Sequence, residues 1–306
     1  MNAPQAPSPT RSALLSGNGA ALVLVVAWGM NFPLIEQLLG HWDILSTTLS
    51  RQVIGATLLV MLLWVRTRRF PIHRALPWRR MAILGFAGPF CASLLTTLAV
   101  FSAGSVAVAI VYAMAPLVAA VVARMFFAIP SSRGVIIGIA LAVTGGLVVK
   151  IHEFSNASVT GGEGFMLLAL VGWTWHSIAA QRWLKGFSQT EIAAYTILPG
   201  SVLLTVTVFI AWASGLVTLH APLTNTTISL AVAIGVVPIA LGNLMWHVGV
   251  NRLGVTPMAL WGNLVPVAAI GLAVWFGTIP QPAQIAGGLI ILAGVVYAQI
   301  TSLRHP

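Results

Sequence analysis

Two parts of the chain place aromatic rings, an amide and imidazoles at helical spacing. Asn243, Trp246 and His247 follow one another at i, i+3 and i+4, so on a helix they share one face. Trp173 and His176 share a face in the same way. Side chains of these types stack on a ligand and hydrogen-bond to it without adding fixed charge. The pattern therefore favours a binding site for a small solute.

The same residue types recur elsewhere beside prolines and near the start of the chain. An asparagine facing lipid would be costly, so we expect these faces to point inward. The predicted substrate-binding residues are Trp28, Asn31, Tyr112, Trp173, His176, Asn243, Trp246, His247 and Asn263. Two alternatives stay open: tight helix packing for the deep tryptophans, and a hydrogen-bonded packing role for the histidines.

Fixed charge is missing from the middle of the apolar stretches. Glu36 and Arg51 lie near the outer ends of the first two stretches, where they are either an outer gate or ordinary interfacial residues. A carboxylate proton relay therefore lacks its residue, although His176 and His247 could titrate. A cavity of Trp, Tyr, Asn and His suits a small amphiphilic solute, such as a zwitterion with an apolar side chain.

Motifs of known enzymes are not found in the sequence. His152-Glu153 is not followed by a second histidine at helical spacing, which argues against a zinc-protease helix. The single cysteine, Cys91, excludes an intramolecular disulfide or a cysteine-rich metal site. We expect no metal and no cofactor. An intramembrane enzyme that uses His176 or His247 remains the alternative from another functional class.

The elements that carry these residues are predicted to be membrane-spanning helices. The composition is 58% hydrophobic and only 7% charged, with a mean hydropathy of +0.96, whereas soluble domains are about a quarter charged. A crossing needs roughly 20 mostly apolar residues. The fold class is therefore all-α integral membrane, and ten stretches qualify: 17–39, 44–65, 81–101, 104–128, 133–151, 162–184, 190–215, 225–250, 254–278 and 281–303. Residues 1–16 are expected to be a disordered cytoplasmic tail, because a cleavable signal peptide fits them poorly.

The basic residues predict the orientation of these helices. With a cytoplasmic N-terminus, 13 of the 15 lysines and arginines fall on the cytoplasmic side, as the positive-inside rule requires. An even number of crossings also returns the C-terminus to the cytoplasm. The location predicted is the bacterial inner membrane, with the lipid bilayer as a partner. The net charge of +10 is thereby explained by orientation, and nucleic-acid binding is disfavoured.

The chain also contains an internal repeat. A shift of 150 residues aligns Pro116 with Pro266 and Ile129-Pro130 with Ile279-Pro280, without a gap over two spans. The predicted domains are a first five-helix repeat at 17–151, a periplasmic linker at 152–161 and a second five-helix repeat at 162–303. Five is odd, so the repeats must be inverted, which is typical of secondary transporters. Pro116 and Pro266 are the predicted hinges, and fixed kinks are the alternative.

Several motifs resemble a known family. These are Trp-Gly-x-Asn at 28–31, Gly-Trp-x-Trp at 172–175, Trp-His-Val-Gly-Val at 246–250, Val-Thr-Pro-Met-Ala at 255–259 and Pro-Val at 266–267. The chain resembles the drug/metabolite transporter superfamily, EamA type, and within it the YddG-type aromatic amino-acid exporters. The resemblance implies an inner-membrane exporter with a central, largely apolar cavity.

The functional hypothesis follows from the repeat, the uncharged core and this resemblance. We expect a carrier that exports small amphiphilic metabolites, above all apolar or aromatic amino acids, by alternating access and as a facilitator. Export of another metabolite or of a drug on the same fold is the nearest alternative. Whether the carrier is a homodimer is left open.

Overall fold

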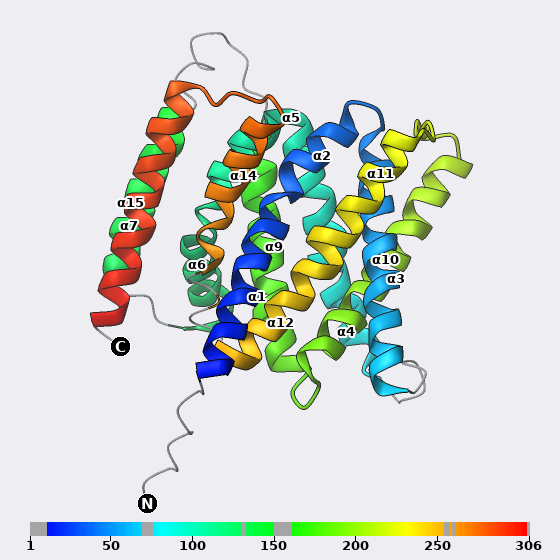
Figure 1. Cartoon of the computed structure of the whole chain (residues 1–306), viewed down its shortest axis with the longest axis horizontal. Helices are drawn as coiled ribbons and strands as arrows, with labels where there is room; N and C mark the ends of the chain where they lie inside the picture. The colour runs from blue at the N-terminus through cyan, green and yellow to red at the C-terminus, as the bar shows by residue number, and fades with distance from the viewer. Residues whose placement is uncertain are drawn as a thin grey trace, which may run out of the picture.

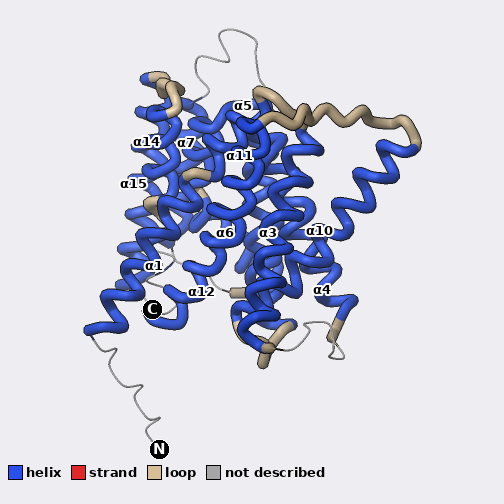
Figure 2. Tube along the Cα trace, turned by 45° about the vertical axis from the view of Figure 1, so that its right-hand side comes forward, coloured by secondary structure: helices blue, strands red, loops and turns tan. Residues whose placement is uncertain are grey.

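The computed structural model describes residues 11–68, 76–129, 133–149, 161–253, 258 and 261–304, and all regular structure in these ranges is helical (Figures 1 and 2). Five helical segments are long and apolar enough to cross a membrane, and further apolar helices are shorter. The five segments are Leu15–Leu39, Ile44–Thr67, Trp78–Tyr112, Gln189–Ala213 and Asn225–Trp246. The all-α prediction agrees with this part of the chain.

The helices overlap the predicted apolar stretches, but the predicted boundary between 101 and 104 is wrong: α5 (Ser93–Tyr112) continues through it with a bend at Gly104. Those of the first half are α1 (Arg11–Gly29), α2 (Asn31–Leu39), α3 (Ile44–Thr67), α4 (Trp78–Gly85), η1 (Phe86–Ala92), α5 (Ser93–Tyr112), α6 (Ala115–Phe127) and α7 (Arg133–Val149). Those of the second half are α9 (Gly162–Trp183), α10 (Gln189–Ala213), α11 (Asn225–Ile234), η2 (Gly235–Leu241), α12 (Gly242–Leu253), α14 (Val265–Trp275) and α15 (Pro282–Arg304). The expected tail at 1–16 lies outside the described residues up to residue 10, and α1 includes the remainder. Of the predicted linker 152–161, only Gly161 is described.

Helix packing has the same pattern in both halves. α1 packs against η2, α12 and α14 of the second half, and its counterpart α9 packs against η1, α5 and α6 of the first. Two helices of the first half pack directly against the helices that correspond to them in the second half: α3 packs against α10, and α7 packs against α15 (Figure 1). Exchanging the two halves therefore leaves these pairings unchanged.

Each half contains a π-helix with a proline at its fourth residue. These are η1 with Pro89 and η2 with Pro238, both seven residues long. Proline has no N–H to donate, so the regular hydrogen-bond ladder is interrupted where it stands. A π-turn is rare and is frequently found at functional sites. The sequence showed prolines within spans but not this helix type.

Pro116 and Pro266 begin helices and do not bend continuous ones. Each stands in the first turn of its helix, α6 or α14, after a two-residue break at 113–114 or 263–264. The N-cap residues have nearly the same backbone angles, φ −76° and ψ −3° at Met114 and φ −85° and ψ −11° at Leu264. Proline is favoured there because the first-turn N–H has no helical acceptor. A kink within a continuous helix was expected at each proline, whereas the structure has a break before each of them, at matching positions in the two halves.

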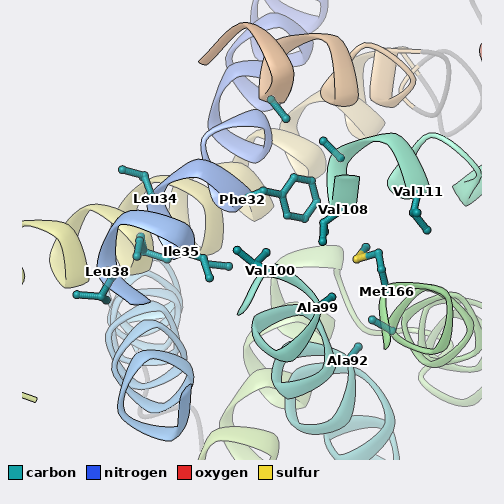
Figure 3. Packing of buried hydrophobic residues seen from close by; sticks show 14 of the residues in the cluster. Phe32, Leu34, Ile35, Leu38, Ala92, Ala99, Val100, Val108, Val111 and Met166 are labelled. Atoms are coloured by element: carbon teal, nitrogen blue, oxygen red, sulfur yellow. The ribbon is translucent and has the colours of Figure 1, made fainter. Parts of the chain in front are cut away.

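The best-packed core lies where α2, α5 and α9 meet. Phe32, Ile35 and Leu38 of α2 pack with Val100 and Val108 of α5 and with Met166 of α9, all at most 3% exposed (Figure 3). These apolar contacts fix α2 against α5, and so fix the break between α1 and α2.

A long loop between α10 and α11 is bound to the corner between α2 and α3 (Figure 2). Asp43 donates its N–H to the His220 carbonyl oxygen (3.0 Å) and accepts the His220 N–H at Oδ2 (2.7 Å). Trp42 donates Nε1–H to the Pro222 carbonyl oxygen at 3.0 Å. Asp43 also caps α3 by accepting the Ser46 N–H at 2.9 Å.

Candidate substrate-binding site

Two of the predicted binding residues, Trp28 and Trp246, stack on each other across the two halves. Their ring centroids are 5.8 Å apart and their planes are inclined by 19°. Gly242, one turn before Trp246 on α12, lies directly against the Trp28 indole, where a side chain would collide with the ring. The stack is half-buried against Leu24 and Met258. The sequence predicted both residues but not their contact.

Tyr112 lies beside Phe32, next to the break between α1 and α2. The ring centroids are 5.5 Å apart, with an edge-to-face angle of 60°. Tyr112 is the last residue of α5, immediately before the break at 113–114, and Asn31 is the first residue of α2. Aromatic pairs of this geometry contribute about 0.5–1.5 kcal/mol beyond the area they bury. The aromatic contact thus joins residues beside two helix breaks, the one between α1 and α2 and the one between α5 and α6.

His176 is buried and fulfils a structural requirement. Its Nδ1 lies 2.8 Å from the Leu84 carbonyl oxygen, so Nδ1–H donates to a carbonyl at the entrance of η1. Pro89, five residues after Leu84, has no N–H for that carbonyl. The imidazole stacks on Trp173 at 5.3 Å and lies against Gly88. Trp173 itself is 39% exposed. This geometry favours the packing interpretation of His176.

The remaining predicted residues do not join one cluster. Asn243 donates Nδ2–H to the Ile239 carbonyl oxygen at 2.5 Å, which ties it to η2. Asn263 is half-buried in the turn before α14. The side chain of His247 lies outside the described residues.

Neither of two grooves on the described surface includes a predicted binding residue. One lies between α1 and η2 and is lined by Val26 and Leu241 among others. The second lies between α3 and α10 and is lined by Ala56 and Val202 among others. The central cavity thus stays a prediction.

Glu36 and Arg51, the predicted outer gate, have different hydrogen-bond partners. Glu36 accepts the Ser105 N–H at 3.1 Å, the Ser105 hydroxyl at 2.5 Å and the Thr278 hydroxyl at 3.4 Å. Gly104, with φ +78°, makes the bend in α5 that frees the Ser105 N–H. Glu36 therefore joins α2 to the bend in the first half and to the α14–α15 linker in the second.

Arg51 is 4% exposed and belongs to a buried polar face of α3 that the sequence analysis missed. Thr47, Thr48, Arg51 and Gln52 are all buried, at spacing i, i+1, i+4 and i+5. Gln52 donates Nε2–H to the Pro89 carbonyl oxygen at 2.7 Å and so supports η1. Four polar residues recurring at this spacing in an apolar stretch were the available signal.

The site therefore offers aromatic stacking and uncharged hydrogen-bonding groups with one buried guanidinium. Within the described ranges, no group of three His, Cys, Asp or Glu residues is close enough to hold a metal ion. Groups of these types can stack on a small molecule and hydrogen-bond to it.

Apolar helical halves that pack alike are the architecture of a secondary transporter. The chain belongs to the EamA-like transporter family, whose model matches residues 15–151 and again residues 160–298. Each half of the chain thus matches the family separately. The family makes this protein a membrane transporter, with a small-molecule substrate and the lipid bilayer around it.

Two relatives and one solved structure support this assignment. A protein of Streptantibioticus cattleyicolor named "Probable terminal-alkyne amino-acid exporter" is 28% identical over 278 residues, which cover 90% of this chain and 91% of the relative. An uncharacterized transporter of Bacillus subtilis, YyaM, is 25% identical over 71% of both chains. A crystal structure covering 96% of this chain and 99% of its own has a TM-score of 0.63 at 19% identity, which shows the shared fold.

Proposed function

We propose that this transporter exports small amphiphilic metabolites, above all apolar or aromatic amino acids, from the bacterial cytoplasm across the inner membrane. The observation that carries the proposal is the similarity, over 90% of the chain, to a relative named as an amino-acid exporter. The aromatic pairs support it, because rings on both sides of the α1–α2 break suit an apolar side chain.

The mechanism proposed is alternating access between two inverted five-helix repeats. The double match of the family model and the exchange symmetry of the contacts support it. The topology proposed has ten crossings with both termini in the cytoplasm. The described chain begins and ends at the same end of the molecule, in line with an even number of crossings (Figure 1).

The predicted hinges and gate have a place in this mechanism. The breaks before Pro116 and Pro266 occupy matching positions in the two halves, so one movement repeated in both would exchange their conformations. Glu36 holds the outer end closed by bonding the α5 bend and the α14–α15 linker. Both roles rest on the proposed topology.

Transport is proposed to follow the substrate gradient without coupling to protons. The acids among the described residues, Glu36, Asp43, Glu163 and Glu191, all lie within the first two turns of a helix, at its N-cap or near the outer ends of the bundle. A helix interior without a carboxylate lacks the residue on which proton relays are usually built.

The direct test uses purified protein in liposomes loaded with labelled L-phenylalanine, L-leucine or L-propargylglycine, a terminal-alkyne amino acid. Efflux is measured with and without an imposed pH gradient, and protein-free liposomes serve as the control. We expect efflux of at least one of these amino acids at a rate unaffected by the gradient. No flux of any amino acid would contradict the substrate class, and strict dependence on the gradient would contradict the facilitator. A resistance screen across drug classes would then identify cargo of another kind.

A further inference from the structure

Arg51 is a buried cation whose hydrogen-bonding capacity is largely unused. The side chain is 4% exposed on α3, and its Nη1 donates to the Asn31 Oδ1 at 3.4 Å, at the outer limit of a hydrogen bond. Its Nε has no hydrogen-bond partner. A guanidinium has five N–H donors. One long bond therefore leaves most of the group unsatisfied.

A buried charge without a counter-ion is expensive and calls for an explanation. Leaving one member of a buried ion pair alone is strongly destabilising, because the remaining charge is uncompensated. The two carboxylates nearest Arg51 in the sequence are bonded to other groups, Asp43 to Ser46 and His220, and Glu36 to Ser105 and Thr278. An intramembrane ionisable residue usually marks the path of a substrate. The guanidinium is thus placed to receive an anion, because no carboxylate among the described residues is bonded to it.

The surroundings of Arg51 match one end of an amino acid. Thr47, one turn earlier on the same face of α3, is fully buried and its hydroxyl has no partner. Asn31 begins α2 directly after the break at Met30, and broken helices hold the substrate site in many carriers. On either side of Asn31 lie the rings of Trp28 and Phe32, each paired with an aromatic of another helix.

We propose that Arg51 binds the carboxylate of the transported molecule, with Asn31 and Thr47 completing the anion site. This inference rests on the proposed function and names the recognition of its substrate. The guanidinium fork binds both oxygens of a carboxylate. The apolar side chain of the substrate then points toward the aromatic pairs beside the α1–α2 break. Since Arg51 is covered by protein, the substrate reaches it only when α3 and the break move apart.

The test compares a series of probes that differ only at the polar end: L-phenylalanine, L-phenylalaninamide, phenethylamine and 3-phenyllactate. Uptake of each into liposomes is measured for the wild type, Arg51→Met, Arg51→Lys and Thr47→Val. Arg66→Met is the matched control, because Arg66 is on the same helix but exposed. Thermal unfolding in detergent identifies any variant that fails to fold.

The wild type is expected to prefer the two carboxylates over the amide and the amine. A hydrogen bond to a charged group contributes about 1.5–3 kcal/mol, so Arg51→Met should reduce kcat/KM for phenylalanine by about 10- to 100-fold. The amide and amine should change little, so that the preference disappears. Arg51→Lys should restore part of the carboxylate flux, and Thr47→Val should raise KM several-fold. Arg66→Met should behave as wild type.

The outcomes separate this inference from the proposed function. A wild type that moves phenylalanine and its amide equally well, with Arg51→Met unchanged, overturns the inference and leaves amino-acid export standing. If Arg51→Met does not fold, the inference is tested on the wild type and Arg51→Lys. A preference of the wild type for the carboxylates that Arg51→Lys weakens supports the inference, and the absence of such a preference overturns it. Transport of phenyllactate but of no amino acid, lost in Arg51→Met, would refute the amino-acid proposal and support the anion site. Transport of none of the carboxylates would overturn both.

Discussion

The polar side chains within the helices bond to backbone groups that irregular helices leave free. His176 and Gln52 donate to the carbonyls of Leu84 and Pro89 at either side of a proline turn. A buried carbonyl without a donor would cost about 1–3 kcal/mol. Such residues help to define the shape of the bundle, whereas the stacked aromatics and Arg51 are the groups that we propose for the substrate.

The stacked indoles give the first prediction at this scale. Trp28→Ala and Trp246→Ala should each reduce amino-acid flux, since each removes one member of the stack. The ring contact alone, about 0.5–1.5 kcal/mol, corresponds to a loss of about two- to tenfold. The double variant should lose little more than either single one, because the pair acts as a unit.

Trp64→Ala is the control for these variants, since Trp64 is 52% exposed on α3. The variants are compared in liposomes at equal protein content. Equal activity of all four, including the control, would remove the stack from the substrate site.

Glu36 gives the second prediction, which concerns the outer gate. Glu36→Ala removes the acceptor of three hydrogen bonds and so releases the α14–α15 linker. Pro280 is half-buried in the same linker, and its substitution leaves the Thr278 hydroxyl in place. Pro280→Cys, introduced into a Cys91→Ser background, should then be labelled by an impermeant maleimide in intact cells about tenfold faster, as expected for the loss of charged hydrogen bonds of about 1.5 kcal/mol.

Leu216→Cys provides the reference for this measurement. Leu216 is 80% exposed in the loop before α11, so its labelling should not depend on Glu36. Unchanged labelling at position 280 would make Glu36 an interfacial residue only. Equal acceleration at both positions would point to general loosening.

Residue types and spacing predicted only part of the site. The shared face of Asn243 and Trp246 was evident from i, i+3 spacing, but the stacking of Trp246 on Trp28 joins helices far apart in sequence. Arg51 was interpreted as part of an outer gate or as an interfacial residue, because its position was counted from the end of an apolar stretch. The structure places it inside the polar face of α3. Spacing along one helix does not specify the partner helix.

At the level of elements, close helix approach depends on glycines at a few positions. α7 and α15 pack through Gly145 and Gly294, where an added Cβ would lie 2.6 Å from the Gly287 carbonyl oxygen and 2.8 Å from that of Gly138. Small residues allow apolar helices to meet in this way, because association in lipid relies on packing.

This contact gives the third prediction. Gly145→Leu should separate α7 from α15 and lower the unfolding temperature in detergent, because overpacking costs about 1–3 kcal/mol. Gly146→Leu is a matched control one residue away, where an added Cβ meets nothing within 4 Å. An equal decrease in both variants would contradict the assigned contact.

The helices themselves were predictable, but their interruptions were only partly so. Apolar length predicts a helix, and the prolines indicated where regularity ends. Whether a proline starts a helix, as at Pro116, or stands inside a π-turn, as at Pro89, depends on donors from other helices. Those donors are known only from the folded chain.

At the scale of the molecule, the repeat found in the sequence reappears as a repeat of contacts. The pairs α3–α10 and α7–α15 join equivalent helices, and α1 and α9 occupy equivalent places (Figure 1). The alignment of Pro116 with Pro266 predicted this correspondence, since both begin a helix after a two-residue break. An account in which two halves exchange conformations around a central substrate follows from this arrangement.

The measurement that tests the carrier most directly is counterflow. Liposomes containing the protein are loaded with unlabelled L-phenylalanine at high concentration and diluted into a trace of the labelled amino acid. A carrier that alternates between two states should draw the label in transiently above its external concentration, and Arg51→Met should slow this accumulation by about 10- to 100-fold. A channel or an enzyme would give no such overshoot, and its absence at active protein levels would contradict the account.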